Sequence, residues 1–213
     1  MFKDRADAAA QLLDRLQPYK NRNPLVLAIP RGAVPMGQAI ARGLGGTLDV
    51  ALVRKLGAPL QPELAIGAID ENGWTCLNQH ATAHTVSADY IAAEKLAQLI
   101  TLRERRALYT PGRAPVAVKD RVVIVVDDGL ATGATMQAAL HGLRAQLPAY
   151  LVCAVPVAPR QATHSIAPLV DRLVCLEVSD DFHAVGQFYS DFSQVDDAEV
   201  ITLLGGQPEP ASP

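Results

Sequence analysis

The sequence has no long apolar run and no excess of positive charge. Its apolar stretches are far shorter than the ~20 residues that a transmembrane helix needs. The first five residues lead into an amphipathic helix and not into the apolar segment of a secretion signal. The net charge of −3 gives nucleic acid and anionic membranes no overall attraction. We therefore expect a cytoplasmic protein that binds neither, with local basic groups for any anionic ligand.

Cysteine is scarce as well. The chain has only Cys76, Cys153 and Cys175, an odd number of residues that lie far apart between apolar neighbours. This pattern predicts reduced, packed thiols and not disulfides or metal ligands. His80 and His84 have the i,i+4 spacing of a metal-binding pair, but they lack a nearby third ligand, so a metal role there is not favoured.

Two common nucleotide-binding patterns are missing. The glycines between Gly43 and Gly46 precede a predicted strand and do not follow one, which excludes the dinucleotide fingerprint of a Rossmann oxidoreductase. A nucleotide-triphosphate P-loop needs a lysine between glycine and threonine, and Ala134 stands there, between Gly133 and Thr135. Any phosphate site must therefore be of another kind.

Apolar residues make up 49% of the 213 residues, enough for a sizeable globular core. Short apolar runs alternate with segments of helical periodicity, which predicts βαβ units. Asp70–Gly73 favours a hairpin turn between strands at 65–69 and 74–77, and a long helix follows at 88–109, with Arg103, Arg105 and Arg106 on a solvated face. We predict further strands at 25–29, 48–53, 122–126, 150–155 and 172–176, and helices at about 4–16, 34–44, 132–143 and 196–204.

The most informative segment is Val122–Thr135. Its buried strand ends in Asp127 and Asp128, and a small, hydroxyl-rich loop then opens a helix. Ligands bind beyond the carboxyl ends of such strands, and a helix start offers N–H groups to a phosphate. Two carboxylates would repel that phosphate unless they bind something else, and ribose hydroxyls or hydrated Mg²⁺ are the natural candidates. A ribose 5-phosphate satisfies both halves of this site.

Val123–Thr135 closely resembles the phosphoribosyl-pyrophosphate (PRPP) motif of type I phosphoribosyltransferases, which has four apolar positions, two acids, two mostly apolar positions and a Thr/Gly-rich loop. The one departure is Gly129, where an aliphatic residue or serine is usual, and we expect it to loosen the turn. The Arg-Lys-x-Gly segment within 52–60 is similar to that of adenine phosphoribosyltransferases. Ala131 stands where the 6-oxopurine enzymes carry aspartate, which disfavours hypoxanthine or guanine as the acceptor.

The resemblance implies an α/β fold with a doubly wound, mostly parallel sheet. It implies a single domain over 1–213, with an inserted flexible hairpin and helix at about 57–118, a small C-terminal hood at about 178–195 and a frayed tail at about 205–213. By family analogy the protein is expected to be a homodimer.

The resemblance also assigns site residues. Asp127 and Asp128 are expected to accept the ribose hydroxyls and to hold Mg²⁺, largely through water and PRPP. Arg54 and Lys55 join them as catalytic residues, and with Arg31 and Gly32 they are expected to bind pyrophosphate in a loop that in the family often has a cis peptide. The loop for the 5′-phosphate comprises Gly129, Leu130, Ala131, Thr132, Gly133, Ala134 and Thr135.

The general base and the acceptor contacts are less defined. Because Ala131 supplies no carboxylate, the base is expected to be Glu63, or else Glu71 in a turn that faces water, although both also fit a solvated surface. The aromatic-rich segment 181–192 resembles the family's hood, in which Phe182, Val185 and Asp191 are expected to contact the acceptor base. Phe182 is the residue expected to stack on it.

We thus predict Mg²⁺-dependent transfer of the 5-phosphoribosyl group from PRPP to a nitrogen nucleophile, a nucleobase or analogue, with release of pyrophosphate. The alternative is a regulatory protein that binds PRPP or a nucleotide on the same fold without turnover. The acceptor is left open.

Overall fold

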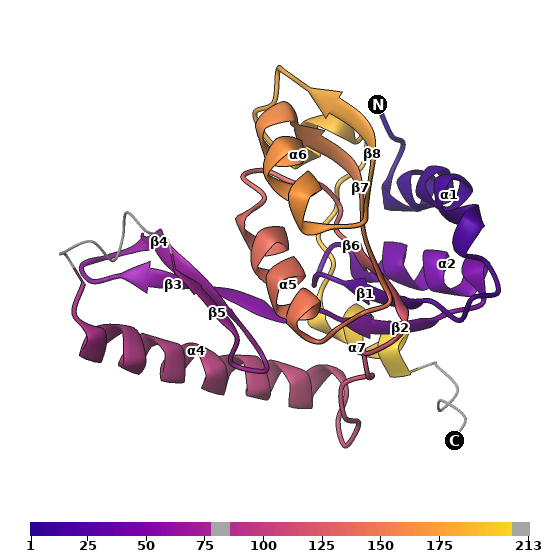
Figure 1. Cartoon of the computed structure of the whole chain (residues 1–213). Helices are drawn as coiled ribbons and strands as arrows, with labels where there is room; N and C mark the ends of the chain where they lie inside the picture. The colour runs from indigo at the N-terminus through magenta and orange to yellow at the C-terminus, as the bar shows by residue number, and fades with distance from the viewer. Residues whose placement is uncertain (78–85, 206–213) are drawn as a thin grey trace.

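The computed structural model describes residues 1–77 and 86–205, apart from the side chains of residues 62 and 63. Its centre is a parallel sheet in the order β2-β1-β6-β7-β8 (Figure 1). The strands are β1 (Leu25–Ala28), β2 (Thr47–Val50), β6 (Val122–Val126), β7 (Tyr150–Pro159) and β8 (Arg172–Ser179).

Helices cover both faces of this sheet. Successive residues of β6 point to opposite faces, so Ile124 and Val126 pack in one core cluster and Val123 and Val125 in the other. The first cluster contains α1 (Arg5–Leu16), α2 (Val34–Leu44) and α7 (Asp197–Gly205), and the second contains α5 (Ala134–Ala145) and α6 (Arg160–Ile166). The expected doubly wound α/β class is confirmed.

The register of the sheet brings two loops together. β1 pairs in parallel with β6, with Ala28 opposite Val126, and the backbone N–H of Ile29 donates to the carbonyl of Val126 at 3.0 Å. The loops after these strands therefore leave the same edge of the sheet side by side. One is the Pro30–Gly32 turn, and the other is the acid pair with its phosphate loop.

The predicted strand at 48–53 is present, but its predicted C-terminal end was wrong. β2 ends at Val50, and the chain leaves the parallel sheet to form β3 (Val53–Ala58). β3 pairs antiparallel with β4 (Gln61–Asp70), which pairs with β5 (Thr75–Leu77). Ala51 and Leu52 are buried although the backbone turns there, so the apolar run continues through the break and hides it.

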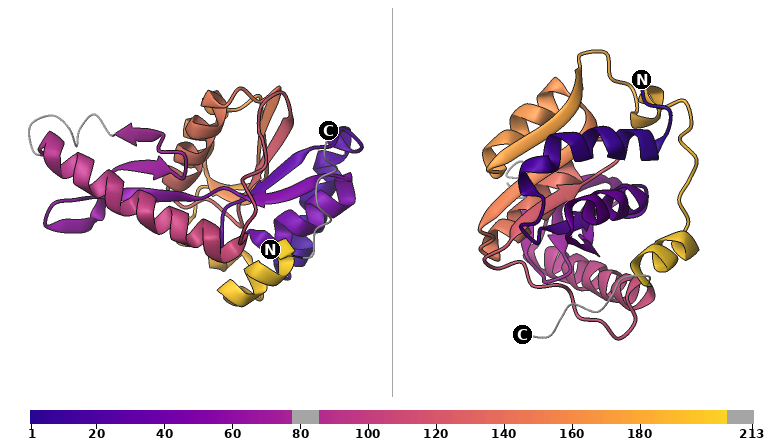
Figure 2. Two further views of the ribbon diagram at one scale, coloured as in Figure 1. Left: turned by 90° about the horizontal axis from the view of Figure 1, so that it is seen from below. Right: turned by 90° about the vertical axis from the view of Figure 1, so that its right-hand side faces the viewer.

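The antiparallel sheet and α4 (Ala88–Tyr109) form an arm that projects from the parallel sheet (Figures 1 and 2). The predicted Asp70–Gly73 turn is confirmed: Gly73 has φ +87°, and Asp70 Oδ1 accepts from the backbone N–H groups of Asn72 and Trp74 at 3.0 and 2.8 Å. The Trp74 ring stacks on His141 of α5 with 5.4 Å between centroids, which attaches the turn to the core.

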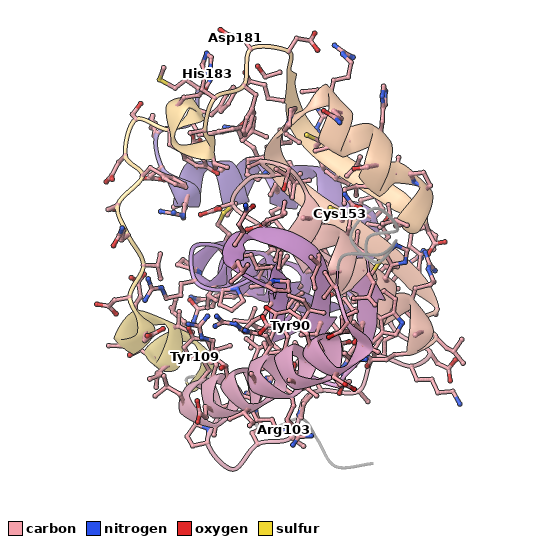
Figure 3. All side chains as sticks on the ribbon, turned by 90° about the vertical axis from the view of Figure 1, so that its left-hand side faces the viewer. Tyr90, Arg103, Tyr109, Cys153, Asp181 and His183 are labelled. Atoms are coloured by element: carbon pink, nitrogen blue, oxygen red, sulfur yellow. The ribbon has the colours of Figure 1, made fainter. Side chains whose placement is uncertain are left out.

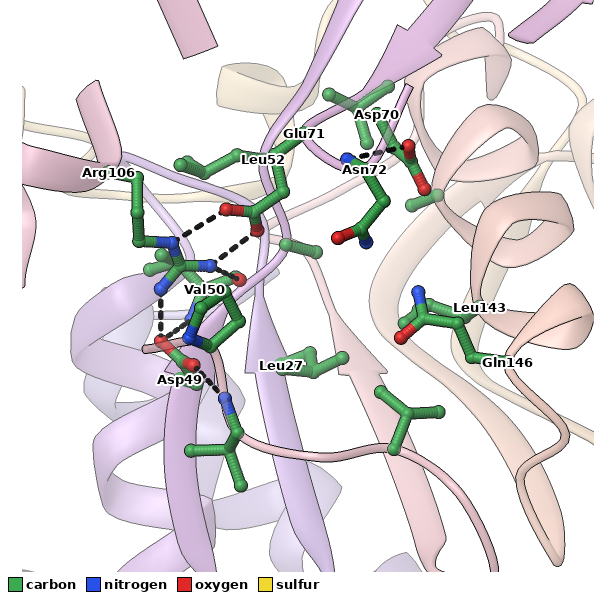
Figure 4. Close-up of a pocket in the computed structure, with 16 residues that line it drawn as sticks. Leu27, Asp49, Val50, Leu52, Asp70, Glu71, Asn72, Arg106, Leu143 and Gln146 are labelled. Atoms are coloured by element: carbon green, nitrogen blue, oxygen red, sulfur yellow. Dashed lines mark hydrogen bonds and ion pairs between the residues drawn. The ribbon is translucent and has the colours of Figure 1, made fainter. Parts of the chain in front are cut away.

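Arg106 anchors the arm, so its predicted place on a solvated face was wrong. Its Nη1 lies 2.6 Å from Oδ1 of the buried Asp49, its Nε donates to Glu71 Oε2 at 2.7 Å, and its Nη2 donates to the Val50 carbonyl (Figure 4). The expectation that Glu71 faces water was also wrong, because this pair buries it. Both corrections have one cause: the partner of each side chain comes from a segment far away in the chain.

The C-terminal segment returns over the N-terminus. After β8, the short helix η3 (Val185–Phe188) leads into Tyr189, which forms a parallel bridge with Phe2. The Phe2 N–H donates to the Phe188 carbonyl at 2.7 Å, and the Ser190 N–H donates to the Phe2 carbonyl at 2.9 Å. The expected hood region is thus tied to the start of the chain. Among residues 1–77 and 86–205, no helix is both long and apolar enough to cross a membrane.

Candidate active site

The turn after β1 lies directly against the acid pair. The Pro30–Arg31 peptide bond is cis, as the family resemblance implies. A Cβ on Gly32 would lie 2.0 Å from Oδ2 of Asp128, far inside any real contact. Only glycine leaves the Asp128 carboxylate in its place, because the backbone of the expected pyrophosphate loop lies directly against that carboxylate.

The two acids have different surroundings. Burial, together with the neighbouring Asp128 carboxylate, raises the pKa of Asp127 well above its ordinary value. The backbone N–H of Asp128 donates to Asp127 Oδ1 at 2.9 Å. Asp128 is paired with Arg5, whose Nε and Nη2 lie 2.9 and 2.7 Å from Oδ2. Sequence reasoning missed Arg5, because nothing in the local pattern of α1 indicates a partner 123 positions away.

The loop expected to bind the 5′-phosphate lines a pocket. A pocket of about 200 Å³ is lined by Asp127, by residues 129–136 and by Val185 of η3. Leu130 anchors the loop through its N–H, which donates to the Val157 carbonyl at 2.9 Å, and Thr132 Oγ1 accepts from the Ala134 N–H at 3.3 Å. α5 begins at Ala134, after Gly133 with φ +76°, so its positive dipole end lies at this pocket.

The sequence suggested that Gly129 loosens the turn. The structure shows instead that this glycine permits close packing. A Cβ there would lie 2.5 Å from Val185 Cγ1 and 3.0 Å from Val157 Cγ1. The hood residue Val185 therefore sits over the turn, in the space that a side chain at position 129 would fill. The expected place of Val185 at the site agrees with this packing.

The other hood residues divide between core and surface. Phe182 stacks on the buried Phe188 with 5.4 Å between ring centroids, so its stacking on an acceptor base stays a prediction. Asp191 is exposed and accepts from the Ser193 N–H at 3.0 Å. On the exposed loop after β8, His183 Nε2 lies 3.1 Å from Asp181 Oδ1 (Figure 3).

Two aromatic residues that sequence reasoning did not assign also contact the site. The Tyr189 hydroxyl donates to the backbone carbonyl of Asp128 at 2.7 Å, and burial raises the pKa of Tyr189, so the phenol keeps the proton that it donates. The Phe192 ring lies under the Arg5 guanidinium, with 3.9 Å from Cζ to the ring centroid. The only sequence signal for these two residues was the high number of aromatic residues in the segment 181–192.

The expected pyrophosphate residues lie on two separate parts of the structure. Arg31 Nη1 lies 3.6 Å from Asp197 Oδ2 of α7. Asp197 also accepts from the Tyr109 hydroxyl at 2.6 Å, and burial raises the pKa of Tyr109 to about 12. Arg54 and Lys55 lie in β3, on the arm, where Arg54 Nε donates to Gln98 Oε1 of α4 at 2.5 Å.

The expected general base and the histidine pair cannot be placed, because they lie outside the described atoms. Glu63 is part of β4, but its side chain is not among those described. His80 and His84 lie in the undescribed segment 78–85. The three cysteines are free thiols, as predicted.

The acid pair suits a metal ion that brings most of its own ligands. In the described part of the chain, no group of three His, Cys, Asp or Glu side chains could hold a metal. Arg5 already occupies Oδ2 of Asp128. Mg²⁺ keeps several waters and is commonly bound by one or two carboxylates plus substrate phosphates. The residues therefore fit Mg²⁺ that enters together with a phosphate ligand.

The fold thus sets an acid pair and a small, glycine-containing loop at the end of the central strand of a parallel sheet, as expected for a phosphoribosyltransferase. The chain belongs to the phosphoribosyl transferase domain family, whose model matches residues 1–193. A crystal structure of the protein TT1426 from Thermus thermophilus is similar over 95% of this chain and 97% of that one, with 42% identity and a TM-score of 0.84. Hypoxanthine-guanine phosphoribosyltransferase from Leishmania donovani is more distant, with 15% identity over 81% of this chain and 79% of that one and a TM-score of 0.46.

Among curated proteins, the chain is 42% identical to a Mycobacterium tuberculosis protein that is provisionally named a phosphoribosyl transferase. The match covers 96% of this chain but 46% of that protein. The chain thus spans about half the length of the curated relatives that it matches.

Proposed function

We propose that the protein transfers the 5-phosphoribosyl group of PRPP to a nitrogen nucleophile, with Mg²⁺, and releases pyrophosphate. The observation that carries this proposal is the position of the acid pair between two elements that we expect to bind anions. On one side lies the phosphate loop at the start of α5, and on the other lies Gly32 of the turn after β1. A ligand with a ribose between two phosphate groups matches this order of contacts.

In this reaction a C1–N bond forms as the C1–O bond to pyrophosphate breaks. Asp127 and Asp128 accept the ribose hydroxyls, and the loop 129–135 holds the 5′-phosphate. Arg31 and the Gly32 backbone hold the leaving pyrophosphate, whose developing charge a bound Mg²⁺ would help to neutralise. One well-placed donor to developing charge is typically worth about 10²–10³ in rate.

Arg54 and Lys55 would join the pyrophosphate contacts only if the arm brings them to the ligand. In this structure Arg54 is bonded to α4, so that step requires it to exchange Gln98 for the ligand. The nucleophile's proton goes to a base, for which we propose Glu63. Glu71 is not available, because Arg106 binds both of its carboxylate oxygens.

The test is to incubate the protein with PRPP, Mg²⁺ and a panel of purines, pyrimidines and non-base amines, and to measure pyrophosphate release. Asp127→Asn/Asp128→Asn should abolish release and weaken PRPP binding. Asp14→Asn, an exposed acid on α1, is the matched control and should change neither. Tight PRPP binding without release for any acceptor would favour the regulatory alternative, and no PRPP binding would refute the site.

A further inference from the structure

Arg5, a residue of the N-terminal helix, binds one carboxylate oxygen of Asp128. It lies in the first turn of α1, and both its Nε and its Nη2 donate to Asp128 Oδ2, at 2.9 and 2.7 Å. The side chains of Arg5 and Asp128 are 13% and 15% exposed, so this pair is largely shielded from water. Such a pair holds a carboxylate in a defined place more firmly than a surface ion pair does.

The contacts on Asp128 leave it one orientation. Oδ2 receives both Arg5 bonds and also faces the Gly32 backbone, where even a Cβ would not fit. The main chain is held as well, because the Tyr189 hydroxyl donates to the Asp128 carbonyl. With Oδ2 engaged in this way, Oδ1 is the oxygen that Asp128 can offer to a hydroxyl of the ligand.

Arg5 is itself fixed by the hood. Phe192 lies under the guanidinium at 3.9 Å, and Nη1 donates to the Ser193 carbonyl at 2.6 Å. Each contact uses the planar guanidinium: the stack uses its face, and the hydrogen bonds use several of its donors at once. Lysine offers a point charge on a flexible stem and cannot reproduce this set of contacts.

We propose that Arg5 is a positioning residue that aims Asp128 Oδ1 at one ribose hydroxyl and thereby sets the preference for ribose over a deoxyribose. The proposal rests on the proposed function, because it takes the ligand's sugar to lie at the acid pair. Arg5 acts through Asp128 and does not itself contact the sugar.

The test compares the affinities of ribose 5-phosphate, 2-deoxyribose 5-phosphate and 3-deoxyribose 5-phosphate by calorimetry. The parent should prefer ribose 5-phosphate over the analogue that lacks the hydroxyl bound by Asp128, by about 10–100-fold for a hydrogen bond to a charged group. The Asp128→Asn variant shows which analogue this is: it is the one over which the preference for ribose 5-phosphate falls most in that variant. Arg5→Ala and Arg5→Lys should each reduce the same preference to about threefold or less, since both lose the planar guanidinium that holds Asp128.

A double variant and a control separate positioning from a structural role. Arg5→Ala/Asp128→Asn should discriminate no less than Asp128→Asn alone, since Arg5 acts through that acid. Arg15→Ala, exposed in the last turn of the same helix, should keep the parent's preference. Arg5→Lys serves if Arg5→Ala does not fold, with thermal unfolding as the check.

Two results would overturn the inference, and they differ from failure of the proposed function. If Arg5→Lys weakens all three sugars equally, Arg5 merely ties the hood to α1. If it keeps the parent's preference while Asp128→Asn loses it, Asp128 needs no help from Arg5. A parent that binds none of the sugar phosphates would refute the proposed function itself, and this inference with it.

Discussion

Replacing Gly32 by alanine should displace the second acid while leaving the fold intact. The added Cβ would lie 2.0 Å from Asp128 Oδ2, 2.9 Å from its Cγ and 3.0 Å from Arg5 Nη2. Gly32 does not have a positive φ, so the backbone itself accepts alanine and the effect comes from space alone. Because real Cβ contacts under 3.0 Å essentially do not occur, the carboxylate oxygen must retreat by roughly 1 Å or more.

That retreat sets the size of the expected loss. A misplacement of about 1 Å in a positioned group can cost about 10²-fold in rate. We therefore expect Gly32→Ala to lower kcat/KM by about 10²-fold, and to weaken ribose 5-phosphate by about 10–100-fold, the range for one hydrogen bond to a charged group. Calorimetry with ribose 5-phosphate and a pyrophosphate-release assay measure the two effects.

The control for this variant is Gly205→Ala. A Cβ on Gly205 meets nothing within 4 Å, so this variant should bind and react as the parent does. Thermal unfolding of both variants shows whether the fold is kept. A folded Gly32→Ala protein with the parent's affinity and rate would mean that Asp128 does not need its place against the turn after β1, and the reasoning about the site would be refuted.

Three further predictions concern the arm, the hood and the hairpin. Arg106→Met should cost about 3–5 kcal/mol in urea unfolding, because it removes the guanidinium from the buried Asp49, which keeps Arg113 Nη2 at 3.5 Å as its ion-pair partner, and from the largely shielded Glu71. The exposed Arg103→Met should stay within about 0.5 kcal/mol of the parent; equal effects would contradict the anchoring role. Gly129→Ala should cost about 1–3 kcal/mol by overpacking, and adding Val185→Ala should recover part of it; no recovery would mean that the two residues do not compete for space. Burial raises the pKa of Asp70, so the parent loses stability as pH rises through that pKa. The stability of Asp70→Asn relative to the parent should therefore be greater at about pH 8 than at about pH 4, and a constant difference would contradict the burial of that charge.

Contacts between residues far apart in the chain join the arm to the core. β3, β4, β5 and α4 lie outside the parallel sheet, and the links to the core are specific contacts. Arg106 pairs with Asp49 of β2, and Trp74 stacks on His141 of α5.

Local sequence was sufficient wherever the determining residues are neighbours in the chain. The central strand, the acid pair and the phosphate loop follow one another within Val122–Thr135, so burial, charge and helix start could all be predicted from one segment. The helices at 34–44 and 88–109 were predicted with their observed bounds. Each has a local signal at one end: Gly45 ends the first with φ +66°, and the Ser87 side chain accepts from the Tyr90 N–H to begin the second.

Only the tertiary structure decided which distant groups meet. Arg5 reaches an acid 123 positions away, and Arg106 reaches Asp49 57 positions away, so helical periodicity placed these arginines without showing their partners. The break between β2 and β3 was hidden because Ala51 and Leu52, which form it, are buried like the strand residues before them. Gly129 looked like a loose turn until Val185, from the hood, proved to occupy the space beside it. In each case the sequence determines which side chain is present and which local structure it favours. The partner of that side chain, and the free energy of their contact, depend on segments that come together only when the chain has folded.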